Sequence, residues 1–459
     1  MPTSSSTAPA HLESSVVRHG RGAYPVQQYL SRHASLRVEP VPVLGEYVRA
    51  LIVPACAESP ELLGGYAAAA AAAPGRTLCI LVINAAEDAS VGTHAANAHC
   101  LEALRWRLAP VRPVSLSCPA ILGSLSHMDV LVLDGASPGQ RLPRRQGVGL
   151  ARRLGCDLAL ALWHSGQLRE PWLYNTDADA TLPATYFTAQ HELLTRAPSV
   201  LLYPFRHQPS SDLEVNLATW AHELRLRHYV AGLEHAGSPY ALHTIGSTLA
   251  IHAKAYAAVR GFPKRRAGED FHILAKLLKV APAERLHTEP IMLASRRSTR
   301  TPFGTGSAVE GWLDSSAPKL LLYHPACFSV LAQWLAALND LAEHRDERRF
   351  QARLGLIQEP ARRVVLQYWE SIDGPAALRA ALLQAPSSLH LKLRLHQHFD
   401  ALRSLRLIHA LRDTLYPSLP WQSALGAAAW GEGLESSTLE EALLHLTERE
   451  RSFGAQVGP

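Results

Sequence analysis

The feature that most constrains the fold is an alternation of short apolar runs with longer helical stretches, which begins near Tyr47. The apolar runs are expected to be buried strands, and the stretches between them are expected to be helices. Expected strands cover residues 47–54, 76–83, 128–133 and 172–175, and expected helices cover 58–73, 91–106 and 146–163. Elements that alternate in this way build a largely parallel sheet with helices on both faces. We therefore predict an α/β fold in which ligands bind at the carboxyl ends of the strands.

The chain changes character beyond about Val309. Residues 320–448 are rich in Leu, Ala, Arg and Gln at spacings of three and four, with proline interruptions, which predicts an α-helical C-terminal domain. We expect three parts: a partly disordered N-terminal extension at 1–45, the α/β domain at 46–308 and the helical domain at 309–459. The helical domain is a candidate for homodimerisation, acceptor binding or peripheral membrane attachment, and the sequence leaves these alternatives open.

Composition narrows the class of partner and the compartment. The net charge is +5, but arginine occurs in short clusters rather than in a stripe with interleaved aromatics, so we expect no nucleic-acid binding. Anionic small molecules or a negative membrane surface suit this charge better. The six cysteines show no paired spacing, which predicts a reducing compartment. Since no signal peptide and no apolar run of about 18 residues is visible, we expect a cytoplasmic protein without a transmembrane segment.

The strongest chemical signal is Asp177-Ala178-Asp179, directly after the expected strand at 172–175. Two carboxylates at i and i+2 in a turn can point to one polar spot. Mg²⁺ or Mn²⁺ is typically held by one or two carboxylates together with substrate phosphates. The alternative is a helix N-cap with an extra turn carboxylate, because Thr181 and Pro183 follow. The motif alone does not decide between the two interpretations.

Two more acidic positions accompany this motif. Glu58 lies in the turn 54–58 after the first expected strand, where the alternative is an ordinary strand-to-helix turn. Glu269 and Asp270 follow Gly268 and open an expected helix at 270–280. An acid at that point can simply stabilise the helix by interacting with the positive end of its dipole, or it can act as a general base on an acceptor hydroxyl.

The order of these motifs over residues 47–306 resembles the family 2 glycosyltransferases with the GT-A fold, a Rossmann-like, mostly parallel sheet. In that family the first strand ends in a proline-containing turn with an acid, and an aspartate, here Asp88, follows the second strand. An Asp-x-Asp motif follows a later strand, and an acidic pair opens a helix. The chain departs from the family at Cys56-Ala57, where a polar or aromatic pair is usual. The QxxRW element of processive polysaccharide synthases is also absent.

The resemblance implies a metal-dependent transfer of a sugar from a nucleotide-sugar donor to an acceptor hydroxyl, with Mn²⁺ or Mg²⁺ as the cofactor. It implies that Asp270, beside Glu269, is the catalytic base of an inverting reaction. Asp179 and Asp177 would hold the metal, and His287 would be a third ligand, although one histidine among 23 is more often a surface or core residue. The residues implied to bind the donor nucleotide are Pro54, Ala55, Glu58, Asp88 and Asp177.

A cationic segment follows the expected strand at 291–294 and contains Arg296, Arg297 and Arg300. Arginine suits bidentate phosphate recognition, so these three residues are candidates for binding the donor diphosphate. The alternative is a solvated basic linker to the C-terminal helices. Residues 237–247, small and hydroxylated, occupy the region that lines the acceptor pocket in GT-A enzymes, although a tight turn has the same composition.

Two rival functions remain. A sugar-phosphate nucleotidyltransferase uses a similar sheet and metal-binding aspartates, and residues 135–143 faintly resemble its glycine-rich loop. That loop belongs after the first strand, whereas here it follows the third. The other rival is a non-catalytic scaffold that binds nucleotide sugars, against which the intact acids Asp177, Asp179 and Asp270 argue.

Overall fold

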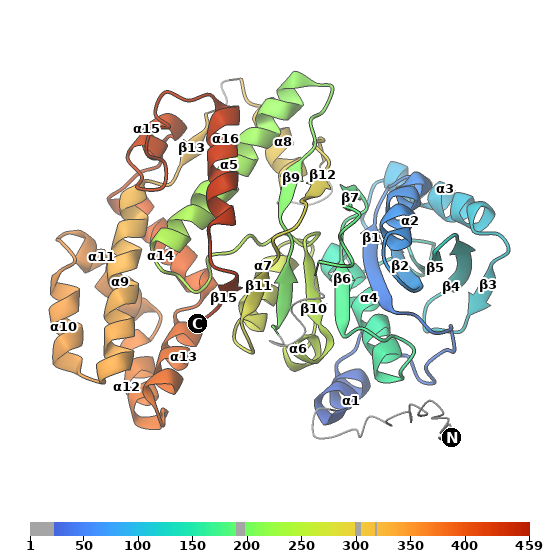
Figure 1. Cartoon of the computed structure of the whole chain (residues 1–459), viewed down its shortest axis with the longest axis horizontal. Coiled ribbons are helices and arrows are strands. Elements are labelled where there is room, and N and C mark those ends of the chain that lie inside the picture. Colours follow the sequence, from blue (N-terminus) through green and yellow to red (C-terminus); the bar gives the residue numbers. More distant parts are fainter. Residues whose placement is uncertain (1–22, 190–197, 299–303, 317–318) are drawn as a thin grey trace, which may run out of the picture.

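The computed structural model describes residues 23–189, 198–298, 304–316 and 319–459. Its centre is a ten-stranded sheet with the order β15-β11-β8-β10-β6-β1-β2-β5-β4-β3. The strands are β1 (Arg49–Ala55), β2 (Thr77–Asn84), β3 (Arg112–Val114), β4 (Ala120–Leu125), β5 (Met128–Gly135), β6 (Trp172–Asn175), β8 (Val200–Leu202), β10 (Leu249–His252), β11 (Ala283–Arg285) and β15 (Gln456–Val457). The predicted mixed α/β class, with a large and mostly parallel sheet, is confirmed (Figure 1).

The four strands expected from apolar runs form the middle of this sheet. β1 pairs in parallel with both β6 and β2, and β2 pairs in parallel with β5. Every residue of β1, β2 and β6 is buried. Continuous apolar runs suit such strands because helices cover both faces of the sheet.

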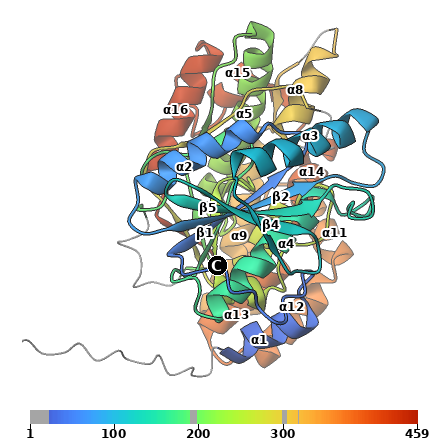
Figure 2. The same ribbon diagram turned by 90° about the vertical axis from the view of Figure 1, so that its right-hand side faces the viewer.

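Helices cover the sheet from two sides. On one face lies α4 (Gly147–His164), accompanied by α1 (Ala23–Arg32), α6 (Ala253–Ala258) and α7 (Glu269–Leu277). On the other face lie α2 (Leu63–Ala71), which follows the short 3₁₀ helix Pro60–Leu62, and α3 (Val91–Arg107). Figure 2 shows α2 and α3 on the side of the sheet opposite α4. Each layer buries its own hydrophobic core against the sheet.

Several elements differ from the sequence-based expectation. β3 and β4 form an antiparallel hairpin beside β5. Strand β10 runs antiparallel between β6 and β8. Helix α1 lies in the expected N-terminal extension, and its Tyr29 hydroxyl donates a hydrogen bond to the Asp157 carboxylate of α4, 2.6 Å away. A small second sheet contains β7 (Ala180–Thr181), β12 (Ile291–Leu293) and β9 (Phe205–His207).

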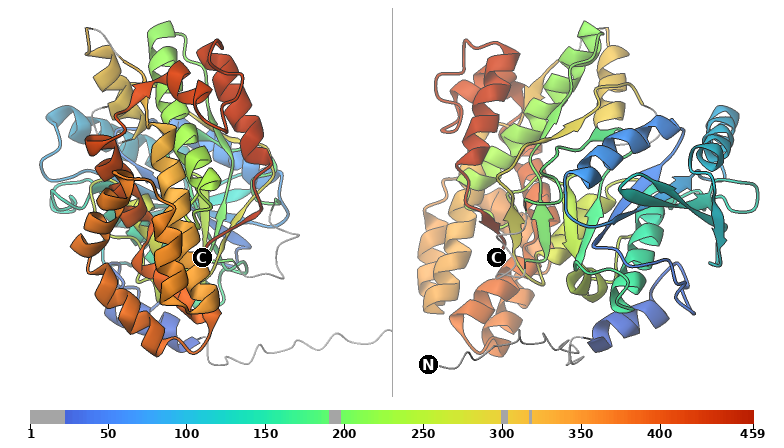
Figure 3. Two further views of the ribbon diagram at one scale, coloured as in Figure 1. Left: turned by 90° about the vertical axis from the view of Figure 1, so that its left-hand side faces the viewer. Right: turned by 45° about the vertical axis from the view of Figure 1, so that its right-hand side comes forward.

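Beyond α8 (Thr305–Leu313) the chain is mainly helical, as its composition predicts. These helices are α9 (Pro325–His344), α10 (Glu347–Gly355), α11 (Ala361–Ser371), α12 (Gly374–Gln384), α13 (Ser388–His398), α14 (Ala401–Thr414), α15 (Trp421–Gly426) and α16 (Leu439–Arg451). They share a separate core with α5 (Leu213–His235), and the right-hand view in Figure 3 shows them grouped on one side of the sheet. β15 then returns to the central sheet beside β11. Within the described residues, no helix is long and apolar enough to cross a membrane.

Candidate active site

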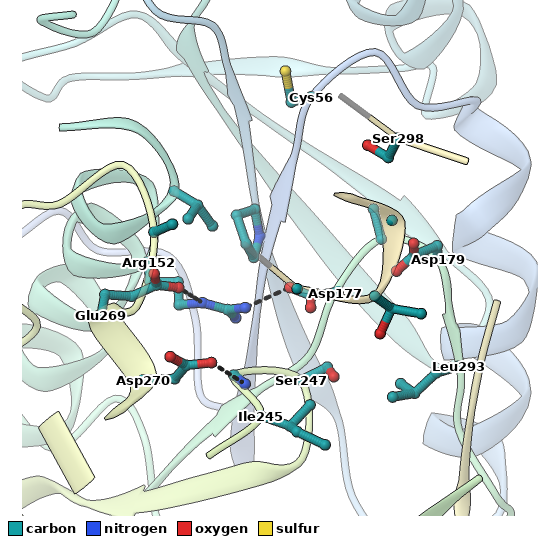
Figure 4. Close-up of a pocket in the computed structure, with 18 of the residues that line it drawn as sticks. Cys56, Arg152, Asp177, Asp179, Ile245, Ser247, Glu269, Asp270, Leu293 and Ser298 are labelled. Atoms are coloured by element: carbon teal, nitrogen blue, oxygen red, sulfur yellow. Dashed lines mark hydrogen bonds and ion pairs between the residues drawn. The ribbon is translucent and has the colours of Figure 1, made fainter. Parts of the chain in front are cut away.

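A cleft of about 470 Å³ opens at the edge of the sheet where β1 and β6 end and β10 begins. Because β10 is antiparallel to its neighbours, the segment before it, residues 244–247, lies at the same edge as the carboxyl ends of the parallel strands. Pro54 of β1 also lines the cleft. The charged lining consists of five acidic and two arginine side chains: Glu58, Asp177, Asp179, Glu269, Asp270, Arg152 and Arg296. Figure 4 shows several of them facing one another.

Strand pairing delivers Asp177 to this cleft. β6 and β1 are parallel with Ile52 opposite Asn175, and the Thr176 amide donates to the Ile52 carbonyl at 3.1 Å. The Tyr66 hydroxyl of α2 donates to the Asp177 carbonyl at 2.8 Å and fixes the turn from the other face. The Asp177 carboxylate therefore follows directly from a rigid strand.

Arg152, in the second turn of α4, joins two of the acidic motifs. Its Nη2 donates to Asp177 Oδ1 at 2.5 Å and its Nε donates to Glu269 Oε1 at 3.1 Å (Figure 4). The side chain is only 3% exposed, and its Nη1 has no hydrogen-bond partner among the described residues. Burial opposes the charge, but Asp177 and Glu269 outweigh it and raise the pKa of Arg152. Gly246 makes room, because a Cβ there would lie 2.5 Å from Arg152 Nη2.

Asp270 stands in the first turn of α7, which begins after Gly268 in a left-handed conformation at φ 71°. Its Oδ2 accepts from the Gly246 amide at 3.1 Å, and its Oδ1 accepts from the Phe271 amide at 2.7 Å. Burial and then repulsion from Glu269 raise the pKa of Asp270 to about 7, although the Phe271 amide and Arg152 pull it down. A carboxylate whose pKa lies near neutrality has the strength expected of a general base.

Arg296 bridges the first turn and the Asp-x-Asp turn. β12 pairs antiparallel with β7, with Leu293 opposite Ala180, so the chain after Leu293 runs beside the residues before Ala180. Arg296 donates to both Glu58 oxygens, with Nη2 2.5 Å from Oε1 and Nη1 3.1 Å from Oε2. Its Nε donates to Asp179 Oδ2 at 2.9 Å. One guanidinium thus connects three loops of the cleft.

The turn after β1 is held by Asn97 of α3, which the sequence did not single out. The Asn97 carbonyl oxygen accepts from the Ala57 amide at 2.7 Å, and Ala57 has a left-handed φ of 53°. The Asn97 amide group donates to the Asn84 carbonyl at 3.0 Å, and the Asn84 side chain lines the cleft. This pair of hydrogen bonds fixes the path of the chain toward Glu58.

The structure does not bring every predicted site residue to the cleft. Asp88 is exposed in the loop before α3 and does not line it. Ala55 is buried within β1, and Arg297 is exposed beyond the lining. His287 is exposed at the rim of a second cavity instead of meeting Asp177 and Asp179. Arg300 lies outside the described residues.

Arg152 is the main residue of the cleft that the sequence did not single out. It was visible only as part of a short basic cluster, Arg152-Arg153. The sequence feature that could have identified Arg152 is the helix around it. α4 is apolar on all sides from Leu158 to Leu162, which indicates a buried helix. An arginine in a buried helix needs a carboxylate partner, and two acids of the cleft supply it.

The described residues contain no group of three or more His, Cys, Asp or Glu side chains arranged to hold a metal ion. Asp177 and Asp179 nevertheless place two carboxylates on one turn of the cleft. Two carboxylates are the usual protein contribution to a Mg²⁺ or Mn²⁺ site that substrate phosphates complete. A cation at this turn would share these oxygens with the arginines that already pair with them, Arg152 with Asp177 and Arg296 with Asp179.

No protein-family model matches the chain, and no curated protein matches its sequence. Among solved structures, the chain is similar to residues 1–349 of TarS from S. aureus, with 11% identity, a TM-score of 0.33, and coverage of 79% of this chain and 89% of that one. It is also similar to the mannosyltransferase PcManGT from Pyrobaculum calidifontis in complex with GDP-Man and Mn²⁺, with 13% identity, a TM-score of 0.32, and coverage of 94% and 93%. At these scores the likeness identifies neither a family nor an activity.

Proposed function

We propose that this protein is a glycosyltransferase that moves a sugar from a nucleotide-diphosphate sugar to an acceptor hydroxyl. The observation that carries the proposal is the convergence of Glu58, Asp177, Asp179 and Asp270 in one cleft at the carboxyl ends of the strands. These acids come from three segments more than 80 residues apart in the sequence. Their order along the chain is the one that the family resemblance requires.

The charge balance of the cleft supports a divalent cation. Five carboxylates face two guanidiniums there, and burial raises the pKa of one of these carboxylates, Asp270, to about 7. A nucleoside diphosphate brings further negative charge and would be repelled without a counter-ion. Mn²⁺ or Mg²⁺ held by Asp177 and Asp179 would offset that charge and stabilise the diphosphate as a leaving group.

Asp270 is the proposed general base. Its carboxylate takes the proton of the acceptor hydroxyl as that oxygen bonds to the anomeric carbon of the donor. The bond from the anomeric carbon to the diphosphate oxygen breaks, and its electron pair leaves with the nucleoside diphosphate. Attack opposite the leaving group inverts the anomeric centre. The amides of Gly246 and Phe271 keep the carboxylate aimed during this step.

The nucleotidyltransferase alternative gains nothing from the geometry. Residues 135–143, the segment that faintly resembles its phosphate loop, contribute no side chain to the described lining of the cleft. The scaffold alternative predicts donor binding without turnover, and the following experiment separates it from the enzyme.

A thermal-shift screen of UDP-, GDP- and other nucleotide sugars with Mn²⁺ identifies the donor, since binding to the folded state raises its stability. We expect Asp179→Ala to abolish metal-dependent donor binding in calorimetry. We expect Asp270→Asn to keep the donor affinity and to lose about 10²-fold or more in turnover. Asp314→Asn, an exposed acid outside the cleft, is the matched control and should change neither quantity.

Unchanged metal and donor affinity in Asp179→Ala would contradict the metal assignment. Wild-type turnover in Asp270→Asn would contradict the assignment of Asp270 as the general base. A folded wild-type protein that binds no nucleotide sugar, with or without Mn²⁺, would end the transferase hypothesis.

A further inference from the structure

A second cavity, of about 340 Å³, lies between the sheet and the C-terminal helix α16. The chain segments around it are the end of β8 and β9, the middle of α5, the loop between β11 and β12, and the last turn of α16. Its apolar wall is formed by Leu202, Tyr203, Pro204, Phe205, Val230, Leu242, Leu286, Pro290 and Phe453. A cavity of this size and lining matches a small-molecule site.

The interior charges of this cavity are already paired. Arg227, 1% exposed, donates from Nε to Glu223 at 2.8 Å, from Nη1 to Glu450 at 2.5 Å and from Nη2 to the Phe205 carbonyl at 2.9 Å. The other Glu450 oxygen lies 2.9 Å from His243 Nε2. Since every nitrogen of Arg227 has a partner, this residue fixes the wall and leaves ligand binding to other groups.

The other three arginines that line the cavity differ in their partners. Arg285 lies over the Phe453 ring at 5.3 Å and pairs with Glu234 at 3.0 Å. Arg206 and Arg451 have no carboxylate partner within the described part of the chain, and Arg451 is exposed. Four arginines thus face this cavity against one lining acid, Glu450. Glu223 and Glu234 lie outside the lining and pair with Arg227 and Arg285. When they are counted as well, four arginines still outnumber three glutamates, and Arg206 and Arg451 are the arginines without a carboxylate partner among the described residues.

We infer that this cavity is a binding site for an amphipathic anion, a molecule with an apolar body and a carboxylate or phosphate head group. The apolar wall would take the body, and Arg206 and Arg451 would take the head group at the rim. The inference stands on the second cavity alone and does not depend on the proposed transferase activity.

The position of the cavity also gives the C-terminal region a role. Leu242, His243 and Thr248 line the second cavity, and residues 244–247 between them line the cleft. This segment therefore makes two contacts. His243 contacts Glu450 of α16, and the Gly246 amide donates to the Asp270 carboxylate. A ligand in the second cavity would touch the segment that holds Asp270.

The test uses the full chain and three probes in calorimetry: octyl phosphate below its micelle concentration, octyl glucoside with the same tail but no charge, and inorganic phosphate with no tail. We expect octyl phosphate to bind at one site and the other two probes to bind at least tenfold more weakly. The double variant Arg206→Ala/Arg451→Ala should lose at least tenfold in octyl phosphate affinity. Arg379→Ala, an exposed arginine of α12 outside the cavity, should lose nothing.

A second variant, Thr447→Trp, fills the cavity from α16 and should also weaken octyl phosphate binding at least tenfold. Thermal melting confirms that each variant is folded. Equal binding of octyl phosphate and octyl glucoside would contradict the preference for an anionic head group. An equal loss of affinity in Arg379→Ala would contradict the assignment of the site to this cavity. No binding of octyl phosphate to the folded wild-type protein would overturn the site itself.

Discussion

The raised pKa of Asp270 makes the proposed reaction sensitive to pH near neutrality. Burial and the neighbouring Glu269 favour the protonated carboxyl, so the base is ionised only above a pKa of about 7. Because a general base acts in its ionised form, kcat/KM should fall about tenfold per pH unit below pH 7 and reach a plateau above it. A pH profile with the identified donor checks this. An acid limb near pH 4, where an ordinary aspartate titrates, would contradict it.

Arg152 should matter for both stability and pH dependence. Arg152→Met leaves Asp177 and Glu269 without their buried counter-charge, which should cost about 3–5 kcal/mol in the free energy of unfolding. It should also move the acid limb of the pH profile upward, because Arg152 lowers the pKa of Asp270. Arg152→Lys should destabilise the protein relative to the wild type, but less than Arg152→Met does, since an ammonium cannot donate to Asp177 and Glu269 in the planar geometry of a guanidinium. Urea unfolding and pH profiles measure both effects, with exposed Arg145→Met as the control. Equal destabilisation by both Met variants would refute this role.

At the residue scale, the sequence could predict that Glu58, Asp177 and Asp270 meet, but the structure leaves Asp88 outside the cleft, and the sequence does not show what holds the other acids. Glu58 and Asp177 follow parallel strands, and strand ends share an edge of the sheet, so their convergence follows from order alone. The bridge from Arg296 to Asp179 depends on the register of β12 against β7, which joins residues more than 100 positions apart. His287 was predicted as a metal ligand only from its position in the sequence. It lies in the loop between β11 and β12, which places it at the second cavity.

At the scale of elements, two glycines offer a matched test of how closely α4 packs. A Cβ on Gly149 would lie 2.4 Å from the Pro263 carbonyl oxygen and 2.7 Å from the Arg265 carbonyl oxygen, in the loop that leads to α7. Backbone atoms cannot move aside cheaply, so Gly149→Ala should destabilise the protein by about 1–3 kcal/mol. It should also lower turnover, because this loop positions Asp270.

The control is Gly64→Ala in α2, where no atom lies within 4 Å of an added Cβ. That variant should stabilise the protein by about 0.4–1 kcal/mol, since alanine restricts the unfolded chain. Urea unfolding compares the two variants. If both changed stability in the same direction and by the same amount, the close contact of α4 with the loop would not matter.

Continuously buried apolar strands were predictable, whereas the 23-residue helix α5 and several short elements were not. The apolar runs gave β6 without error and placed β1, β2 and β5 to within two residues at each end, because continuous burial leaves a clear pattern. β15 has only two residues, Gln456 and Val457, and exists because β11 offers an edge. Helix α1 also depends on tertiary contacts, since its Tyr29 packs against Asp157 of α4 and Tyr256 of α6. Tertiary contacts create such elements, and local sequence does not encode them.

At the scale of the whole molecule, the last strand ties the helical region to the sheet. The chain leaves the sheet for α8 and the C-terminal helices and returns as β15, where Val457 pairs with Ala283 of β11 and is 5% exposed. The ion pair between Arg227 of α5 and Glu450 of α16 lies just before that return. Loss of the strand should therefore weaken the sheet and the helices together, as one cooperative unit.

Val457→Asp tests this cooperation. A carboxylate at a buried position of the sheet has no partner there and should cost about 2 kcal/mol or more, so we expect a lower melting temperature in a single shared transition. Val43→Asp is the matched control, because Val43 is 83% exposed and the same substitution should leave the melting temperature nearly unchanged. Calorimetry resolves the number of transitions. Two separate transitions, with only one shifted in Val457→Asp, would show instead that the helical region and the sheet unfold independently and that β15 is a local attachment.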